Sequence, residues 1–330
     1  MKSSTALIPV ACALTLASCS SSKHDPTEHY YLITTNVTVS YWQTASAGLS
    51  KAARDIGVLA EMNGPDSYDP AAEHSAFQKV LGKNPTGILV SAAAANAVQG
   101  DIDAAIQRGI PVITIDSDAP ASKRLLFVGT NNYQAGMMGG RLAAKLLNGR
   151  GNVVMYTMPG QPNLEERMHG YKDVFTENPG IHVARVIDIK GDPTIAFDST
   201  VNVLKDDKAK VDGFICLEAI ACKEVADVLD RNHVSGKTVI AMDTDKGTLQ
   251  WIQKGMIAAT IAQKPYTMAY FGVQLLDDLH HSKNPVPAGG PSDTFSPLPS
   301  FVDTGTTLID KSNVDTFLKN SQTATSTQRT

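Results

Sequence analysis

The sequence predicts an α/β protein built from two doubly wound parallel sheets. Short β-branched runs alternate along most of the chain with segments whose apolar residues recur every three to four positions, a pattern typical of repeated strand and helix. This alternation restarts midway with no linker of disordered composition. The mature body of about 290 residues is long for a single core and suits two lobes of ordinary size.

In the first half, five apolar runs predict strands, with a helix after each of the first three. The runs are YYLITT, VLAEMN, TGILVS, PVITID and LLFVGT. The first helix has an apolar face from Ala45 to Ile56 and is expected to end at Gly57. Asp69 and Pro70 form an N-cap followed by proline at the first helical position, which predicts the start of the second helix.

The second half repeats this order. Helices are expected over 138–146, 164–175, 194–205 and 221–229, and strands over 152–157, 182–189, 213–217 and 238–243. The stretch from Val239 to Pro265 then reads as strand, loop, helix, strand and a Lys-Pro break. Two strands of this stretch end on polar residues, Asp243 and Gln263, at the edge where open α/β sheets bind ligands.

The chain is expected to cross between the two sheets three times. The crossings are predicted near 129–132, near 263–265, and within the Pro- and Gly-rich loop 284–300. A last strand pair is expected over 301–309 and a last short helix over 313–318. The predicted organisation is a signal peptide at 1–18, a lipidated tether at 19–29, lobe one at 30–129 plus 264–295, lobe two at 130–263 plus 296–318, and a disordered tail at 319–330.

The N-terminus has the features of a secretory signal. Lys2 precedes an apolar run from Ala6 to Ala17 that is too short for a stable membrane span. Leu16-Ala17-Ser18-Cys19 resembles a bacterial lipobox, in which Cys19 is lipidated and becomes the first mature residue. Ordinary cleavage with Cys19 as a bystander is the alternative. The lipobox interpretation predicts an exported protein, anchored by lipid to the bacterial membrane and facing the periplasm or the cell exterior.

Composition and motifs exclude several classes of function. The net charge of -4 offers no electrostatic basis for nucleic-acid binding, and a repressor would need a basic helix-turn-helix where this chain has a signal. Cys216 and Cys222 could pair, but we expect two buried free thiols, and the cysteine spacing predicts no metal site. No cofactor is expected.

An enzyme is the less favoured hypothesis. The sequence has no Gly-x-Ser-x-Gly elbow, no Gly-x-Gly-x-x-Gly after the first strand and no phosphate-binding loop. The glycine-bearing run GTNNYQAGMMGG is better interpreted as a hinge followed by close helix packing. Asp116, Glu218 and Asp243 could in principle hydrolyse a glycoside, but nothing else in the sequence supports that chemistry.

Three short patterns together carry a resemblance to a known family. AATIAQKP (Ala258 to Pro265), VITID (ending at Asp116) and Arg167-x-x-Gly-Tyr resemble the type I periplasmic binding proteins, most closely the ribose, xylose and allose branch that serves ABC transporters. The resemblance covers about Tyr30 to Leu318. It implies two Rossmann-like lobes joined by three hinge segments, a monomer that encloses a monosaccharide or polyol, and an ABC permease as partner. A sensor component for chemotaxis or a sensor kinase is the alternative.

The resemblance also implies the ligand-binding residues, which are Tyr41, Trp42, Asp116, Arg167, Glu218, Asp243 and Gln263. The aromatic pair would cover the apolar face of a sugar ring, although both rings could instead be core anchors. The carboxylates would accept hydrogen bonds from adjacent hydroxyls. Thr35 or Asn36 would add a further hydrogen bond.

The chain departs from the ribose-binding pattern at three places. Ser117 stands where an arginine is common, which removes a five-donor fork and argues against ribose itself. Glu218 stands where the family usually has Asn or Asp, and the longer side chain would narrow the pocket. Asp192 and Pro193 lie where relatives often have an aromatic lid, so the pocket is expected to close against Trp42 alone or to hold a polyol of different shape.

Overall fold

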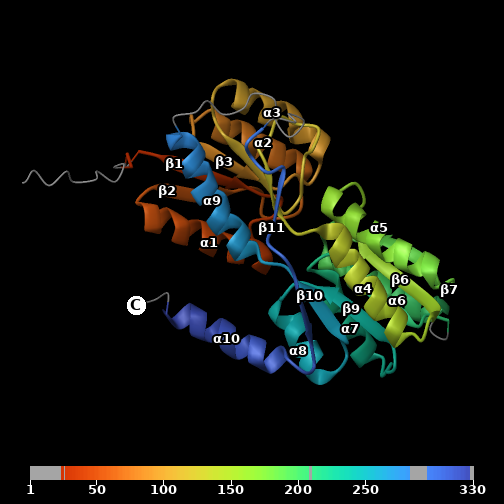
Figure 1. The fold of residues 1–330 in the computed structure, drawn as a ribbon. Coiled ribbons are helices and arrows are strands. Elements are labelled where there is room, and N and C mark those ends of the chain that lie inside the picture. Colours follow the sequence, from red (N-terminus) through yellow and green to blue (C-terminus); the bar gives the residue numbers. More distant parts are fainter. Residues whose placement is uncertain (1–23, 26, 208–209, 283–295, 328–330) are drawn as a thin grey trace, which may run out of the picture.

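The computed structural model describes residues 24–25, 27–207, 210–282 and 296–327, and Figure 1 shows two α/β lobes joined by several segments. The strands are β1 (His29–Ile33), β2 (Leu59–Asn63), β3 (Gly87–Val90), β4 (Val112–Ile115), β5 (Phe127–Gly129), β6 (Arg150–Thr157), β7 (Gly180–Asp188), β8 (Gly213–Cys216), β9 (Thr238–Met242), β10 (Ala259–Ala262), β11 (Phe301–Asp303) and β12 (Thr307–Asp310). The helices are α1 (Ser40–Ile56), α2 (Pro70–Leu81), α3 (Ala95–Gln107), α4 (Asn132–Leu146), α5 (Pro162–Glu177), α6 (Pro193–Asp207), α7 (Ala221–Arg231), α8 (Lys246–Lys254), α9 (Pro265–His281) and α10 (Val314–Thr327).

The strands form two sheets of the same design. The first has the order β11-β5-β4-β3-β1-β2 and the second the order β12-β10-β9-β8-β6-β7. Pairing is parallel throughout except between β10 and β12. The prediction of two doubly wound parallel sheets is therefore confirmed. Because parallel strands end at the same edge, each lobe presents one row of strand-to-helix loops for ligand binding.

Local sequence signals explain where the helices begin and end. The Asp69 carboxylate accepts hydrogen bonds from the backbone N–H groups of Ala71 and Ala72, as expected for an N-cap of α2. Gly57 ends α1 at a φ of 80°, a left-handed conformation that glycine adopts without steric cost. Apolar residues of α1 and α9 pack on one face of the first sheet, while those of α2 and α3 pack on the other. Both faces of its central strands are thus buried, as parallel sheets require.

Three segments connect the lobes, and one differs from the prediction. The first crossing joins β5 to α4, and the second joins β10 to α9, as expected. The third lies at residues 304–306, between β11 and β12, and not within 284–300. Residues 301–303 were assigned to lobe two but pair with β5 in the first sheet, where Phe301 stacks on Phe127. The density of Pro and Gly therefore did not locate the crossing, and residues 284–295 of the predicted loop lie outside the described residues.

Two further predictions are wrong. Cys216 and Cys222 form a disulfide, with their Cα atoms 5.7 Å apart, because the first turn of α7 folds back beside the end of β8. The C-terminal segment, expected to be disordered from 319, continues α10 to Thr327. The first turns of this helix pack against the core of the second lobe through Phe317 and Leu318.

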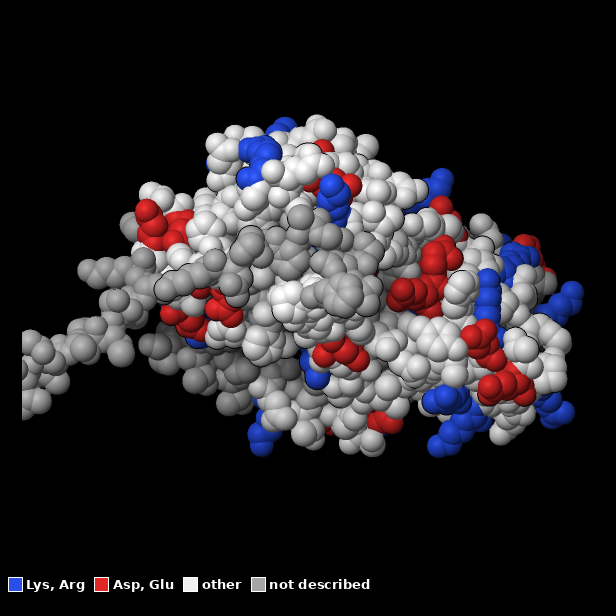
Figure 2. Space-filling model, turned by 45° about the horizontal axis from the view of Figure 1, so that its top comes forward, with Lys and Arg blue, Asp and Glu red and all other residues white. Residues whose placement is uncertain are grey.

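The predicted signal peptide (1–18) and Cys19 lie outside the described residues. Within the described part of the chain, no helix is both long and apolar enough to cross a membrane. On the face shown in Figure 2, acidic and basic side chains are interspersed rather than gathered into a basic patch.

Candidate functional site

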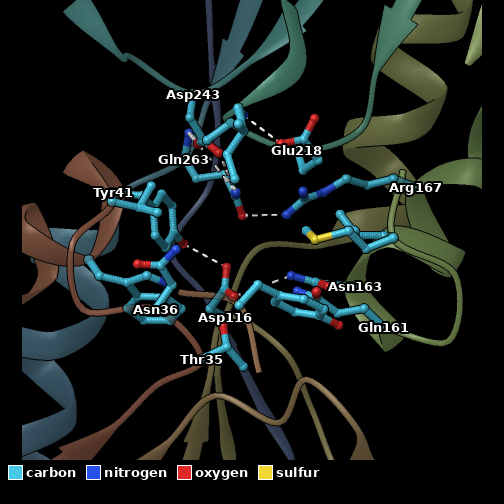
Figure 3. Close-up of a pocket in the computed structure, with 17 residues that line it drawn as sticks. Thr35, Asn36, Tyr41, Asp116, Gln161, Asn163, Arg167, Glu218, Asp243 and Gln263 are labelled. Carbon is cyan, nitrogen blue, oxygen red and sulfur yellow. Dashed lines mark hydrogen bonds between the residues drawn. The ribbon is translucent and has the colours of Figure 1, made fainter. Parts of the chain in front are cut away.

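A cavity between the two lobes brings all seven predicted site residues together. Its empty volume, which includes space open to solvent, is about 530 Å³. It lies at the carboxyl ends of strands from both sheets, and Figure 3 shows polar side chains from both lobes turned toward its centre. The lining residues are Thr35, Asn36, Val39, Tyr41, Trp42, Tyr68, Asp116, Met158, Gln161, Asn163, Leu164, Arg167, Glu218, Ala219, Ile220, Asp243 and Gln263.

Asp116 and Asp243 occupy equivalent places in the two lobes. Each follows the strand next to an edge pair, β4 or β9, and each has a positive φ, 61° and 64° respectively. The Asp116 N–H donates to the carbonyl of Val128 in β5, and the Asp243 N–H donates to that of Ile261 in β10. A left-handed backbone is unfavourable for a residue with a side chain and persists where the surroundings hold it in place. The same backbone turn therefore directs one carboxylate from each lobe into the cavity.

The Asp116 carboxylate is held from three sides. The Tyr41 hydroxyl donates to its Oδ1 at 2.7 Å, and the Ser91 hydroxyl donates to its Oδ2 at 3.1 Å. Asn163, from the opposite lobe, donates its side-chain N–H to Oδ2 at 3.2 Å. Tyr41 is therefore committed to positioning Asp116, and Asn163 connects the lobes across the cavity.

A second network links Arg167, Gln263 and Asp243. Arg167 is 2 % exposed, and its guanidinium donates to Asn132 Oδ1, to the carbonyl of Leu217 and to Gln263 Oε1. The Gln263 side-chain amide in turn donates to both oxygens of Asp243 at 3.2 Å. Gln263 therefore orients both the cation and the carboxylate of lobe two while standing at the crossing into lobe one.

Glu218 lines the cavity but also caps a helix. Its carboxylate accepts hydrogen bonds from the backbone N–H groups of Ile220 and Ala221, at the start of α7. Each oxygen keeps a second lone pair for another donor. The predicted ligand contact and a structural cap are thus combined in one side chain.

Burial perturbs all three cavity carboxyls. Desolvation raises the pKa of Glu218 to about 7 and that of Asp243 to about 6, and it raises the pKa of Asp116. The nearby Arg167 charge opposes each shift. Burial favours the neutral acid because the charged form loses water, and hydroxyl donors that enter the cavity would add hydrogen bonds to the charged form.

The aromatic side chains come from lobe one. Tyr41 and Trp42 are buried, with their ring centroids 5.1 Å apart in an edge-to-face arrangement. Tyr68, which the sequence analysis did not identify, lines the same cavity and packs against the core of lobe two. Tyr68 lies against Gly191 of lobe two. Gly191 precedes Asp192 and Pro193, the positions at which relatives often have an aromatic lid residue and this chain does not. The opposite lobe thus supplies an aromatic ring at that place.

Sequence reasoning also missed Gln161 and Asn163. Both stand at the N-terminus of α5 in the loop after β6, a position equivalent to the other strand-end loops that were searched. The buried oxygens Gln161 Oε1 and Asn163 Oδ1 have no hydrogen-bond partner among the residues that the structure describes. Buried polar atoms are normally paired, so these two acceptors point to a polar ligand.

Comparisons with known proteins agree with this geometry. Residues 30–283 match the family model described as "Periplasmic binding protein domain". A xylose/arabinose-binding protein of Sulfolobus acidocaldarius is 23% identical over 87% of this chain and 71% of its own. A ribose import binding protein of Bacillus subtilis is 23% identical over 74% of this chain and 78% of its own.

Solved structures are similar over nearly their whole lengths. The arabinose-binding protein AraP of Geobacillus stearothermophilus is 34% identical, with a TM-score of 0.72 over 88% of this chain and 99% of that one. A solute-binding protein of Burkholderia graminis, solved with D-arabinose, is 26% identical, with a TM-score of 0.80 over 88% and 98% of the two chains. These relatives are binding proteins and not enzymes, in agreement with the expectation from the sequence. From its two-lobe fold, its interlobe cavity and these matches, this chain belongs to the periplasmic binding protein family, in its sugar-binding type I branch.

Proposed function

We propose that this protein captures a monosaccharide, a pentose or a hexose, between its lobes and delivers it to an ABC permease. One observation carries the proposal: two buried aspartates, Asp116 and Asp243, enter one cavity from equivalent strands of opposite lobes. A carboxylate can accept hydrogen bonds from two adjacent hydroxyls, and a sugar ring presents such pairs around its edge. The relatives solved or described with arabinose and xylose support the same ligand class.

The remaining lining residues suit a sugar ring. Trp42 and Tyr68 offer apolar surface for its C–H faces. Asn163 and Gln161 offer unpaired acceptor oxygens for its hydroxyls. Arg167 has five N–H donors, and three hydrogen bonds to the protein use part of them. The remaining donors can bind a ring oxygen or a hydroxyl oxygen of the ligand.

Ligand binding is proposed to stabilise a closed arrangement of the lobes. Besides the Asn163–Asp116 hydrogen bond, Ser40 in lobe one donates its hydroxyl to Asp245 in lobe two at 3.2 Å. A ligand that contacts both aspartates gains its full set of hydrogen bonds only when the lobes are together, so it shifts the population toward closure. A permease can then distinguish loaded from empty protein by the relative position of the lobes.

The decisive test is a calorimetric titration with pentoses and hexoses, beginning with arabinose, xylose, ribose, glucose and galactose. Asp243→Ala is expected to fold normally and to bind the best ligand about ten- to a hundredfold more weakly, because it loses a charge-assisted hydrogen bond worth roughly 1.5 to 3 kcal/mol. Asp198→Asn, which alters an exposed carboxylate on α6, is the matched control and should bind as the wild type does. Binding by Asp243→Ala that equals the control would reject this site.

Membrane attachment belongs to the same proposal. Lipidation of Cys19 would hold the protein at the membrane that contains the permease, and the protein would act there as a monomer. Cys19→Ser is expected to release it into the soluble fraction after export, while sugar binding stays unchanged. A variant that remains in the membrane fraction would contradict the anchor.

A further inference from the structure

A cluster of two histidines and two carboxylates lies on lobe one, apart from the sugar cavity. Its members are His24, Glu28, Asp277 and His281. His24 and Glu28 precede β1, whereas Asp277 and His281 stand one turn apart at the end of α9. None of the four lines the interlobe cavity. The fold thus joins residues from the two ends of a lobe, more than 240 positions apart, into one group.

The distances within the cluster match the donor spacing around a tetrahedral metal ion. His24 Nδ1 lies 3.5 Å from Glu28 Oε2 and 3.3 Å from Asp277 Oδ1. His281 Nε2 lies 3.1 Å from the same Glu28 oxygen and 3.6 Å from the same Asp277 oxygen. Zinc holds four ligands at about 2.0 to 2.1 Å, which sets neighbouring donor atoms roughly 3.3 Å apart. Four of the six donor pairs therefore already have this spacing, and all four atoms lie within 4.8 Å of one another.

The two carboxylates lie close together with little water around them. Glu28 and Asp277 are each only 7% exposed, and both face the same two imidazoles. Neighbouring buried carboxylates repel one another, so a cation bound between them would be favourable. In addition, the buried Nδ1 of His24 has no hydrogen-bond partner within the described residues.

Neighbouring groups hold the carboxylates in place. The backbone N–H of Asp25 donates to Glu28 Oε1 at 2.9 Å, which leaves Oε2 turned toward the histidines. The Tyr30 hydroxyl donates to Asp277 Oδ1 at 3.0 Å, deep in lobe one. Such supporting hydrogen bonds are typical of metal sites, where they orient the ligands and tune their basicity.

We propose that His24, Glu28, Asp277 and His281 form a structural zinc site that fastens the segment before β1 to the end of α9. Two imidazoles and two carboxylates suit Zn²⁺ better than Ca²⁺ or Mg²⁺, which prefer six or more oxygen ligands. Because His24 precedes the first strand, the bound ion would hold the chain before β1 against the end of α9.

The test uses the full chain, purified without a polyhistidine tag and stripped with chelator. Titration with Zn²⁺ is expected to show one ion bound per chain and to raise Tm, since a ligand that binds only the folded state stabilises it. Co²⁺ in place of Zn²⁺ should give the intense visible absorption of a tetrahedral centre. Sugar affinity should be the same with and without the ion, so failure of this proposal and failure of the sugar proposal are separable.

Matched variants assign the ligands. Asp277→Asn and His281→Ala are expected to lower Zn²⁺ affinity at least tenfold, whereas Asp278→Asn, the exposed neighbour on the same helix, should leave it unchanged. His24→Ala alters only the segment before β1 and therefore serves if a helix variant fails to fold; it too should lose at least tenfold. Absence of Zn²⁺ binding at micromolar concentration, or binding that His24→Ala and His281→Ala retain, would overturn the proposal.

Discussion

At the scale of single residues, the cavity depends on buried groups that hold one another in position. Tyr41, Gln263 and Arg167 were predicted as ligand contacts, yet in the structure their polar atoms largely serve neighbouring side chains. A residue type indicates which hydrogen bonds a side chain can make but not which partner takes them. The seven residues could be named because the resemblance to the family implied them, whereas Asn163 lies outside the three short patterns that carry it.

Glu73 is a buried acid outside the cavity and gives a prediction at this scale. It is fully buried in α2, one oxygen accepts the N–H of Ala93 at 3.3 Å, and the other has no partner in the described part of the chain. Burial raises its pKa to about 8. The folded state therefore binds more protons than the unfolded state between about pH 4.5 and 8. The contribution of Glu73 to the free energy of unfolding is fully present below this range. It is lost as the pH rises through the range, by up to ~1.4 kcal/mol per pH unit.

Glu73→Gln removes this titration. In thermal unfolding from pH 5 to 8, the variant is expected to lose less stability with rising pH than the wild type, and to exceed it at pH 8. Glu177→Gln, which neutralises an exposed acid, should follow the wild-type curve. Parallel curves for Glu73→Gln and wild type would show that Glu73 does not titrate in this range.

At the scale of elements, close packing of α4 on α5 positions Arg167. The glycine-bearing run was predicted to be a hinge followed by close helix packing, and the structure confirms the packing. A Cβ at Gly136 of α4 would overlap the backbone carbonyl of Arg167 in α5, and one at Gly170 of α5 would overlap the carbonyl of Tyr133 in α4. Backbone atoms cannot move aside as a flexible side chain does, so the two helices approach this closely only with glycine.

Two glycine substitutions with opposite expected effects on the free energy of unfolding test this contact. Gly136→Ala is expected to lower the free energy of unfolding by about 1 to 3 kcal/mol through overpacking, and to weaken sugar binding by moving Arg167. Gly100→Ala, in the exposed face of α3 with open space around it, should instead stabilise by roughly 0.5 to 1 kcal/mol through helix propensity. Urea unfolding measures both, and a stabilising Gly136→Ala would contradict the packing.

At the scale of the whole molecule, the lobes meet at contacts that ligand binding is proposed to favour. Gly191 lies in lobe two with a φ of 69°, and a Cβ there would overlap the Cβ of Tyr68 in lobe one. Strain from a positive φ acts within one lobe, but the overlap with Tyr68 exists only when the lobes are together. A substitution at this position therefore opposes closure in addition to straining the loop.

Gly191→Ala is expected to enlarge the radius of gyration in solution scattering and to lower sugar affinity, while lobe folding persists. Gly236→Ala is the matched control. Gly236 has a φ of 76° and open space around it, so this substitution strains the backbone without creating an overlap with another residue. If both variants bind sugar equally well and scatter alike, the Tyr68–Gly191 contact has no part in closure.

The sequence by itself determined the two parallel sheets, the order of helices and strands along the chain, and two polar residues at strand ends that line the cavity. Those features follow from short-range patterns: periodicity, Gly57 and Asp69 at helix ends, and polar residues such as Asp116 and Asp243 where strands stop. Only the tertiary structure decided the place of β11, the Cys216–Cys222 disulfide, the extent of α10, and the cluster of His24 with His281. The place of β11 and the histidine cluster depend on which distant segments become neighbours, which a linear pattern does not record. The disulfide joins residues only six positions apart and depends on how the chain turns between β8 and α7.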